Sequence, residues 1–191
     1  MDESRQYGLE RGKVYPVEAA SGLVNPLRHL IAPPDRLVRR ARLAPGARVL
    51  ELGPGPGWWS VALAAQLANG HLALCDLQPG MVSLARDRLG PTRTGAVSAT
   101  SGDALALPYR DAAFDAAVLV TVLGEVPDPP AALVELARVL RPRGRLVISE
   151  TRLDSDFITA AALEERVVAA GFDPEARYGP PWHYTATFLR R

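Results

Sequence analysis

The sequence predicts an α/β fold with a doubly wound parallel sheet, built as a single domain of 191 residues. From residue 47 onward, short runs rich in aliphatic residues alternate with helical stretches, which is the order that builds right-handed β–α–β units. Several of these runs lack a polar face, as is typical of parallel strands that helices cover on both sides. The length suits one domain, and no internal repeat or low-complexity linker divides it.

The expected elements follow one another in a regular rhythm. Five segments are predicted to be strands: 47–52, 71–76, 96–100, 114–121 and 145–151. The segments between them with helical spacing are 58–68, 79–89 and 129–140. Asp128 and Pro129 stand at the N-cap and first position of the third helix, where their residue types are favoured. The remainder predicts a helix over 159–172 and two more strands.

Residues 1–46 do not follow this rhythm, and we expect them to form a helical extension or lid on a domain of residues 47–191. Within them, 33–43 predicts a helix and 25–31 a turn or a second helix. Six arginines lie between Arg28 and Arg48, against one acidic residue. Two interpretations stay open for this basic segment: a solvated basic face, which is the favoured one, or a surface that attracts an anionic substrate or a membrane.

The charge balance and the cysteine count exclude several classes of protein. With 22 basic and 21 acidic residues the net charge is +1, far from that of a protein that grips nucleic acid along its length. The single Cys75 excludes a disulfide framework and a cysteine-based zinc site. The first twenty residues lack the apolar core of a signal peptide, and no apolar run approaches the ~20 residues of a membrane span. We therefore expect a cytoplasmic protein with no nucleic-acid partner, and either a monomer or a homodimer.

A glycine-rich loop follows the first predicted strand. In residues 49–60, VLELGPGPGWWS, the strand ends near Glu51 and is followed by Gly53, Gly55 and Gly57. Glycines let the backbone turn sharply and approach a ligand closely, and the two intervening prolines stiffen the loop. The spacing fits neither the dinucleotide pattern G-x-G-x-x-G nor a P-loop, which needs a lysine. An acid two residues ahead of G-x-G-x-G favours a ligand with a cationic amine and no pyrophosphate.

Two further acids follow the next two strands. Asp76 ends the second strand, where a carboxylate can accept hydrogen bonds from both ribose hydroxyls of a nucleoside. Asp103 follows the third strand, and its carboxylate with the N–H of Ala104 can bind the edge of an adenine. Met81 can stack on that base or fill the core. Because the carboxyl ends of parallel strands meet at one edge of a sheet, these groups are expected to converge there.

These motifs resemble those of the class I S-adenosylmethionine-dependent methyltransferases, from about residue 45 to the end of the chain. ELGPGPG is similar to that family's first motif, Asp76 to its ribose-binding acid, and GDALALPY to its adenine-side loop. The resemblance implies a Rossmann-like, mostly parallel sheet of seven strands with the last antiparallel. The chain departs from the family at residues 141–144, RPRG, where Arg143 stands in place of a glycine of the usual PGG turn.

The resemblance also implies S-adenosylmethionine as the cofactor and S-adenosylhomocysteine as the product, with no metal. The residues it assigns to the cofactor are Glu51, Gly53, Gly55, Gly57, Asp76, Leu77, Met81, Asp103, Ala104 and Thr121. It assigns no catalytic group. Glu125, His29 and His183 are candidate bases, although each histidine is as readily explained as a packing or surface residue, and Glu125 as a supporting one.

The function that follows from this resemblance is methyl transfer by in-line displacement to an unidentified small molecule. Positioning the acceptor against the activated methyl group can supply on the order of 7–11 kcal/mol of the barrier. Three alternatives stay open: a binding module that holds the cofactor without consuming it, a methyltransferase acting on protein or RNA, and a nicotinamide oxidoreductase.

Overall fold

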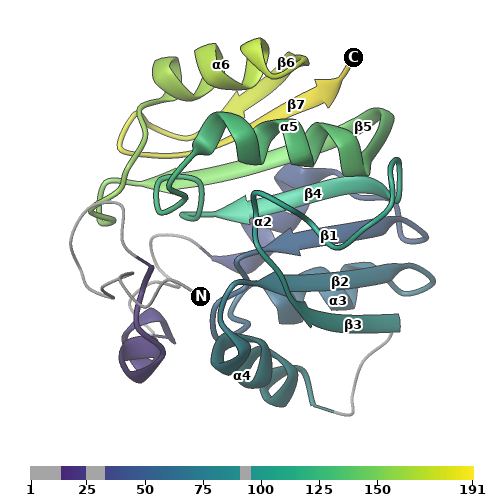
Figure 1. The fold of residues 1–191 in the computed structure, drawn as a ribbon, viewed down its shortest axis with the longest axis vertical. Helices are drawn as coiled ribbons and strands as arrows, with labels where there is room; N and C mark the ends of the chain where they lie inside the picture. Colours follow the sequence, from purple (N-terminus) through teal and green to yellow (C-terminus); the bar gives the residue numbers. More distant parts are fainter. Residues whose placement is uncertain (1–13, 25–32, 91–95) are drawn as a thin grey trace.

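The structure, a computed structural model, describes residues 14–24, 33–90 and 96–191 and confirms the predicted α/β class (Figure 1). One sheet holds seven strands in the order β3-β2-β1-β4-β5-β7-β6. The first five are parallel, and β7 is antiparallel to both of its neighbours, as the family resemblance implies. Their bounds are β1 Arg48–Leu52, β2 His71–Asp76, β3 Ala96–Ser101, β4 Phe114–Val120, β5 Leu140–Thr151, β6 Phe172–Tyr178 and β7 His183–Arg190.

Helices cover both faces of the sheet (Figure 1). One face packs against α2 (Pro34–Ala41), α3 (Ser60–Gln66) and α4 (Pro79–Leu89), and the other against α5 (Pro129–Val139) and α6 (Ala160–Ala169). Successive strand residues point to opposite faces, so Val49 of β1 joins the first core and Leu50 the second. Both are fully buried, which explains why the strands have no polar face.

The expected start of α5 is confirmed. The carboxylate of Asp128 accepts a hydrogen bond from the backbone N–H of Ala131, at 3.1 Å, and Pro129 opens the helix. α2 likewise has a proline at its first position and packs on α3 and β7. A short 3₁₀ helix, η1 (Val17–Val24), was not predicted, and it lies against α4 near the edge where the parallel strands end (Figure 1).

Two elements begin two or more residues away from their predicted start. α3 begins at Ser60 rather than near Trp58, because the backbone is still turning at Gly57, whose N–H donates to the carbonyl of Pro54. β5 begins at Leu140, five residues early, because Leu140 pairs with the start of β4 across an irregular register. The possible helix at 25–31 lies outside the described residues.

The substituted turn at residues 141–144 is strained in the way its sequence predicts. Arg143 has a φ of 62°, in the left-handed region that a glycine tolerates better. A Cβ at the next position, Gly144, would lie 2.7 Å from the carbonyl oxygen of Arg141, so that glycine is required. Neither residue lies near the carboxyl edge of the sheet, where the expected site is.

Among the described residues, no helix is both long and apolar enough to cross a membrane. The division of the chain at residue 46 stays a prediction.

Candidate functional site

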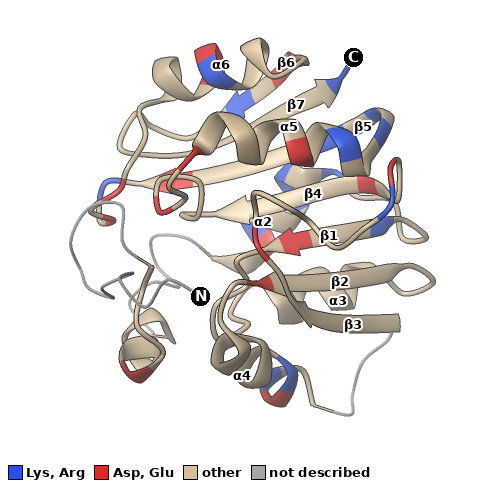
Figure 2. Cartoon of the chain, in the orientation of Figure 1, with Lys and Arg blue, Asp and Glu red and all other residues tan. Residues whose placement is uncertain are grey.

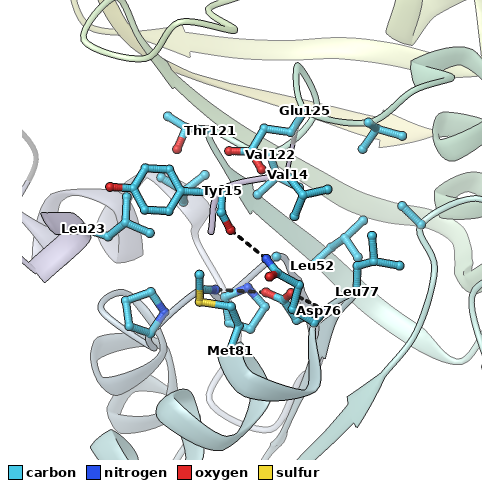
Figure 3. A pocket seen from close by; sticks show the side chains of 18 of the residues that line it. Val14, Tyr15, Leu23, Leu52, Asp76, Leu77, Met81, Thr121, Val122 and Glu125 are labelled. Carbon is cyan, nitrogen blue, oxygen red and sulfur yellow. Dashed lines mark hydrogen bonds between the residues drawn. The ribbon is translucent and has the colours of Figure 1, made fainter. Parts of the chain in front are cut away.

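A cavity opens at the carboxyl edge of the sheet, where β1, β2 and β4 end (Figure 3). Acidic residues gather along this edge (Figure 2). Most of the residues assigned to the cofactor from the sequence lie in its wall. They are Gly53, Gly55, Asp76, Leu77, Met81, Asp103, Ala104 and Thr121, together with the candidate base Glu125.

The glycine loop forms the floor of the cavity, and its three glycines do different things. All three have positive φ angles, between 53° and 78°. A Cβ on Gly53 would lie 2.5 Å from the side chain of Val122, and one on Gly57 would lie 2.8 Å from the backbone of Ala85. A Cβ on Gly55 would meet nothing closer than 3.7 Å, so this glycine leaves open space in the cavity. Gly57 does not line the cavity but lets the loop pack on α4.

Asp76 is fixed by the backbone around it. Its side chain is buried, one carboxylate oxygen accepts the N–H of Gln78 at 2.9 Å, and the other accepts the N–H of Gly55 at 3.2 Å (Figure 3). Burial raises the pKa of Asp76, and these two hydrogen bonds oppose that shift. Each oxygen keeps a second lone pair, so the carboxylate can still accept two hydroxyl donors from a ligand.

Asp103 and Ala104 form the wall beyond β3. One carboxylate oxygen of Asp103 accepts the N–H of Leu105 at 2.9 Å, which holds the side chain in a tight turn. The loop that follows is tied to α5 by Arg138, which donates to the carbonyls of Leu107 and Tyr109. Arg138 on α5 therefore holds the loop that follows Asp103, and through this loop it helps to fix the position of Asp103.

Glu51 lies beneath the cavity rather than in its wall. Its side chain is 2% exposed, and Oε2 has no hydrogen-bond partner among the described residues. Burial is the main cause that raises the pKa of Glu51 to about 7, with a smaller contribution from the nearby charge of Asp76. An orphaned, buried carboxylate oxygen of this kind is what a bound cationic or hydrogen-bonding group would satisfy.

Glu125 lies on the opposite wall, after β4 (Figure 3). Burial raises its pKa to about 8, and the charge of Asp154, which also lines the cavity, adds to this shift. A carboxyl group with a pKa near neutral pH, facing a cavity, is poised to exchange a proton with a bound molecule.

The N-terminal wall of the cavity holds no residue that the sequence analysis assigned to the cofactor. Val14, Tyr15 and Leu23 line the cavity, and the side-chain amide of Gln78 donates to the carbonyl of Tyr15 at 2.8 Å (Figure 3). Trp58 and Trp59 also line it. The Gln78 contact joins residues 63 positions apart, so no local pattern in the sequence could have revealed it.

The cavity wall is acidic. Its described residues include four carboxylates and no lysine or arginine, and the carboxylates are Asp76, Asp103, Glu125 and Asp154. Such a wall favours a cationic ligand. No group of three or more potential metal ligands lies among the described residues.

The two candidate histidines are not part of this wall. His183 begins β7 but lies in a neighbouring smaller pocket. His29 lies outside the described residues.

Comparison with known proteins identifies the family. A family model described as a methyltransferase domain matches residues 50–148, just over half of the chain. A demethylmenaquinone methyltransferase of Beutenbergia cavernae is 40% identical over 121 residues, which are 61% of this chain and 48% of that protein. One from Mycobacterium marinum is 35% identical over 141 residues, 71% of this chain and 57% of that protein. The chain thus spans about half the length of the curated relatives it matches.

Solved structures share the fold at low sequence identity. A SAM-dependent methyltransferase from Aquifex aeolicus superposes with a TM-score of 0.84 at 19% identity, covering 93% of this chain and all of that one. The [4+2]-cyclase SpnF superposes with a TM-score of 0.70 at 22% identity, covering 82% of this chain and 79% of that one. The fold alone therefore does not fix the reaction. The match to the family model does fix the family: the chain belongs to the class I S-adenosylmethionine-dependent methyltransferases.

Proposed function

We propose that this protein transfers a methyl group from S-adenosylmethionine to a small-molecule acceptor. The observation that carries the proposal is the acidic cavity, in which four carboxylates face a common space with no basic residue among the described wall residues. S-adenosylmethionine carries a sulfonium and an ammonium group, so it has the charge that this wall favours. Its ribose offers two vicinal hydroxyls, which match the free lone pairs on the Asp76 carboxylate.

Each remaining contact is assigned by the chemistry of the residue that supplies it. Asp103 and the N–H of Ala104 are proposed to bind the adenine edge, with Leu77 and Met81 against its faces. Gly53, Gly55 and Thr121 are proposed to lie along the methionine part, where the open space at Gly55 admits a ligand. Glu51 supports this end through its unpartnered oxygen. Gly57 contributes by fixing the loop on α4.

The cofactor, when bound, supplies a methyl group that is already activated by its bond to a positively charged sulfur. The protein's own contribution is to align the acceptor and exclude water. Glu125 is proposed to take the proton that the acceptor loses. A positive charge in the same cavity lowers the pKa of Glu125 from about 8, which frees its carboxylate to act as the base near neutral pH.

The acceptor is proposed to be a small molecule because apolar side chains line the space beside the cofactor residues. Tyr15, Leu23 and Trp59 give that space an apolar wall, which suits a flat organic ring. The names of the relatives supply demethylmenaquinone as one compound to be tested among others.

The test uses methyl-labelled S-adenosylmethionine and a cell extract separated into small-molecule and macromolecular fractions. We expect the label to pass into the small-molecule fraction, and E125Q to slow transfer while binding S-adenosylhomocysteine as the wild type does. E18Q, at an exposed position on η1, is the matched control and should transfer normally. Label in the macromolecular fraction would contradict the small-molecule proposal. Binding of S-adenosylhomocysteine with no transfer to either fraction would indicate a binding module.

A further inference from the structure

A second, small pocket lies directly beside the acidic cavity. Trp59 and Val120 line both spaces, so a group held in the second pocket is next to whatever occupies the first. Its polar wall comes from three elements, α2, β5 and β7. The side chains that supply it are Arg36, Arg40, Ser149, His183 and Thr185.

This pocket has the opposite charge to its neighbour. Arg36 and Arg40 are four residues apart on α2, so they project from the same side of the helix. Neither forms an ion pair with a carboxylate of the described residues, whereas Arg138 and Arg145 are each paired with an acid at 2.8 Å or less. Arg40 instead donates to the hydroxyl of Thr185 at 3.2 Å and lies 5.7 Å from the centre of the Tyr178 ring.

His183 is the second observation that points to a ligand. The residue is 6% exposed, and its Nδ1 has no hydrogen-bond partner in the part of the chain that the structure describes. Burial is the main cause that lowers the pKa of His183, followed by the charges of Arg40 and Arg36. The ring is therefore neutral near pH 7, and His183 lines the pocket. In the tautomer with the proton on Nδ1, an oxyanion in the pocket would accept a hydrogen bond from that nitrogen and neutralise the arginines.

We infer that Arg36, Arg40 and His183 form an oxyanion subsite that holds a carboxylate or phosphate group of the methyl acceptor. The inference rests on the proposed function, because it needs an acceptor beside the cofactor. The two pockets divide the charges between them. The acidic wall holds the cationic cofactor, and the basic pocket across Trp59 anchors the anionic end of the acceptor. Arg36 and Arg40 belong to the basic segment between Arg28 and Arg48. On this interpretation they bind an anionic substrate and are not simply part of a solvated basic face.

The test uses inorganic phosphate as the probe and the imidazole proton signals of His183 as the readout. The protein has three histidines, so H183Q identifies the signal. Phosphate is titrated at constant ionic strength against a chloride control. We expect a saturable shift of the His183 signal with phosphate and none with chloride. R36Q, at an exposed position, should weaken phosphate binding at least fivefold.

R39Q is the matched control, because Arg39 is exposed on the same helix but does not line the pocket. It should bind phosphate within twofold of the wild type. No shift with phosphate, or an equal loss in R36Q and R39Q, would overturn the subsite and leave only a basic surface.

Calorimetric titration with S-adenosylhomocysteine separates this inference from the proposed function. If the wild type binds S-adenosylhomocysteine and R36Q binds it equally well, the subsite belongs to the acceptor. If R36Q loses affinity for S-adenosylhomocysteine but keeps it for 5′-methylthioadenosine, which lacks the amino-acid part, the subsite holds the cofactor's carboxylate and the acceptor assignment is overturned. A wild type that binds phosphate but not S-adenosylhomocysteine would refute the proposed function and, with it, the acceptor assignment.

Discussion

Replacing Asp76 by alanine is the sharpest perturbation of the cofactor site. The carboxylate accepts backbone N–H groups of Gly55 and Gln78 and has two lone pairs left for ligand hydroxyls. Hydrogen bonds to a charged group contribute about 1.5–3 kcal/mol each, so losing two ligand bonds costs at least about 3 kcal/mol. At about 1.4 kcal/mol per factor of ten, the affinity for S-adenosylhomocysteine should fall roughly 100-fold or more.

The stability of the ligand-free protein should change much less than the affinity. D76A removes two backbone contacts, but it also removes a carboxylate whose burial is unfavourable, as the raised pKa of Asp76 indicates. A net loss of about 1 kcal/mol would lower the melting temperature by roughly 2–4 °C in a protein of this size. Calorimetric titration and a thermal melt measure the two quantities, and D87A, at an exposed position on α4, is the control. An affinity of D76A within threefold of the wild type would refute the ribose assignment.

The other predictions concern the loop, the buried acid and the adenine-side wall. G55A should lower the free energy of unfolding by about 1–2 kcal/mol, because alanine is strained in the left-handed backbone conformation at this position. G57A adds a collision with the backbone of Ala85 and should lower the free energy of unfolding by about 2–5 kcal/mol. Urea unfolding measures both values, and equal losses would contradict the different roles of the two glycines. Because the pKa of Glu51 is raised from 4.5 to about 7, its contribution to stability is complete below pH 4.5 and is lost as the pH rises to 7, by about 3 kcal/mol. Urea midpoints at pH 5 and pH 8 measure this loss of stability, and E51Q should remove it. E164Q, on an exposed face of α6, is the control and should show the same loss as the wild type. If E51Q has the same pH dependence as the wild type, Glu51 is not the source of that dependence. R138A should lower stability by about 1–3 kcal/mol and also weaken S-adenosylhomocysteine binding, since it releases the loop after Asp103; unchanged binding by titration would show that the loop is held without it.

The sequence predicted most of the scaffold because the relevant signals are local. The bounds of β2 and α4 agree with prediction to the residue, since an apolar run ends at Asp76 and the next helix opens with Pro79. The convergence of Asp76 and Asp103 followed from the parallel topology alone, which brings successive strand ends to one edge.

The parts that the sequence did not predict depend on contacts between distant residues. The close approach of Gly57 to the backbone of Ala85, 28 positions further along the chain, is one such contact. The N-terminal wall is held by the Gln78–Tyr15 hydrogen bond, which leaves no periodic pattern in the sequence. His183 was a candidate base from the sequence, but only its packing beside α2 decides that it lies in the basic pocket.

The central claim is that the acidic edge of the sheet binds the nucleoside of the cofactor. A crystal structure with bound S-adenosylhomocysteine would test this claim most directly, because it shows the position of every atom of the nucleoside. We predict density for the ribose at the Asp76 carboxylate and for the adenine beside Asp103 and Ala104, with the sulfur pointing toward Glu125. Density for the nucleoside elsewhere on the molecule, with this acidic edge filled by solvent alone, would contradict the claim.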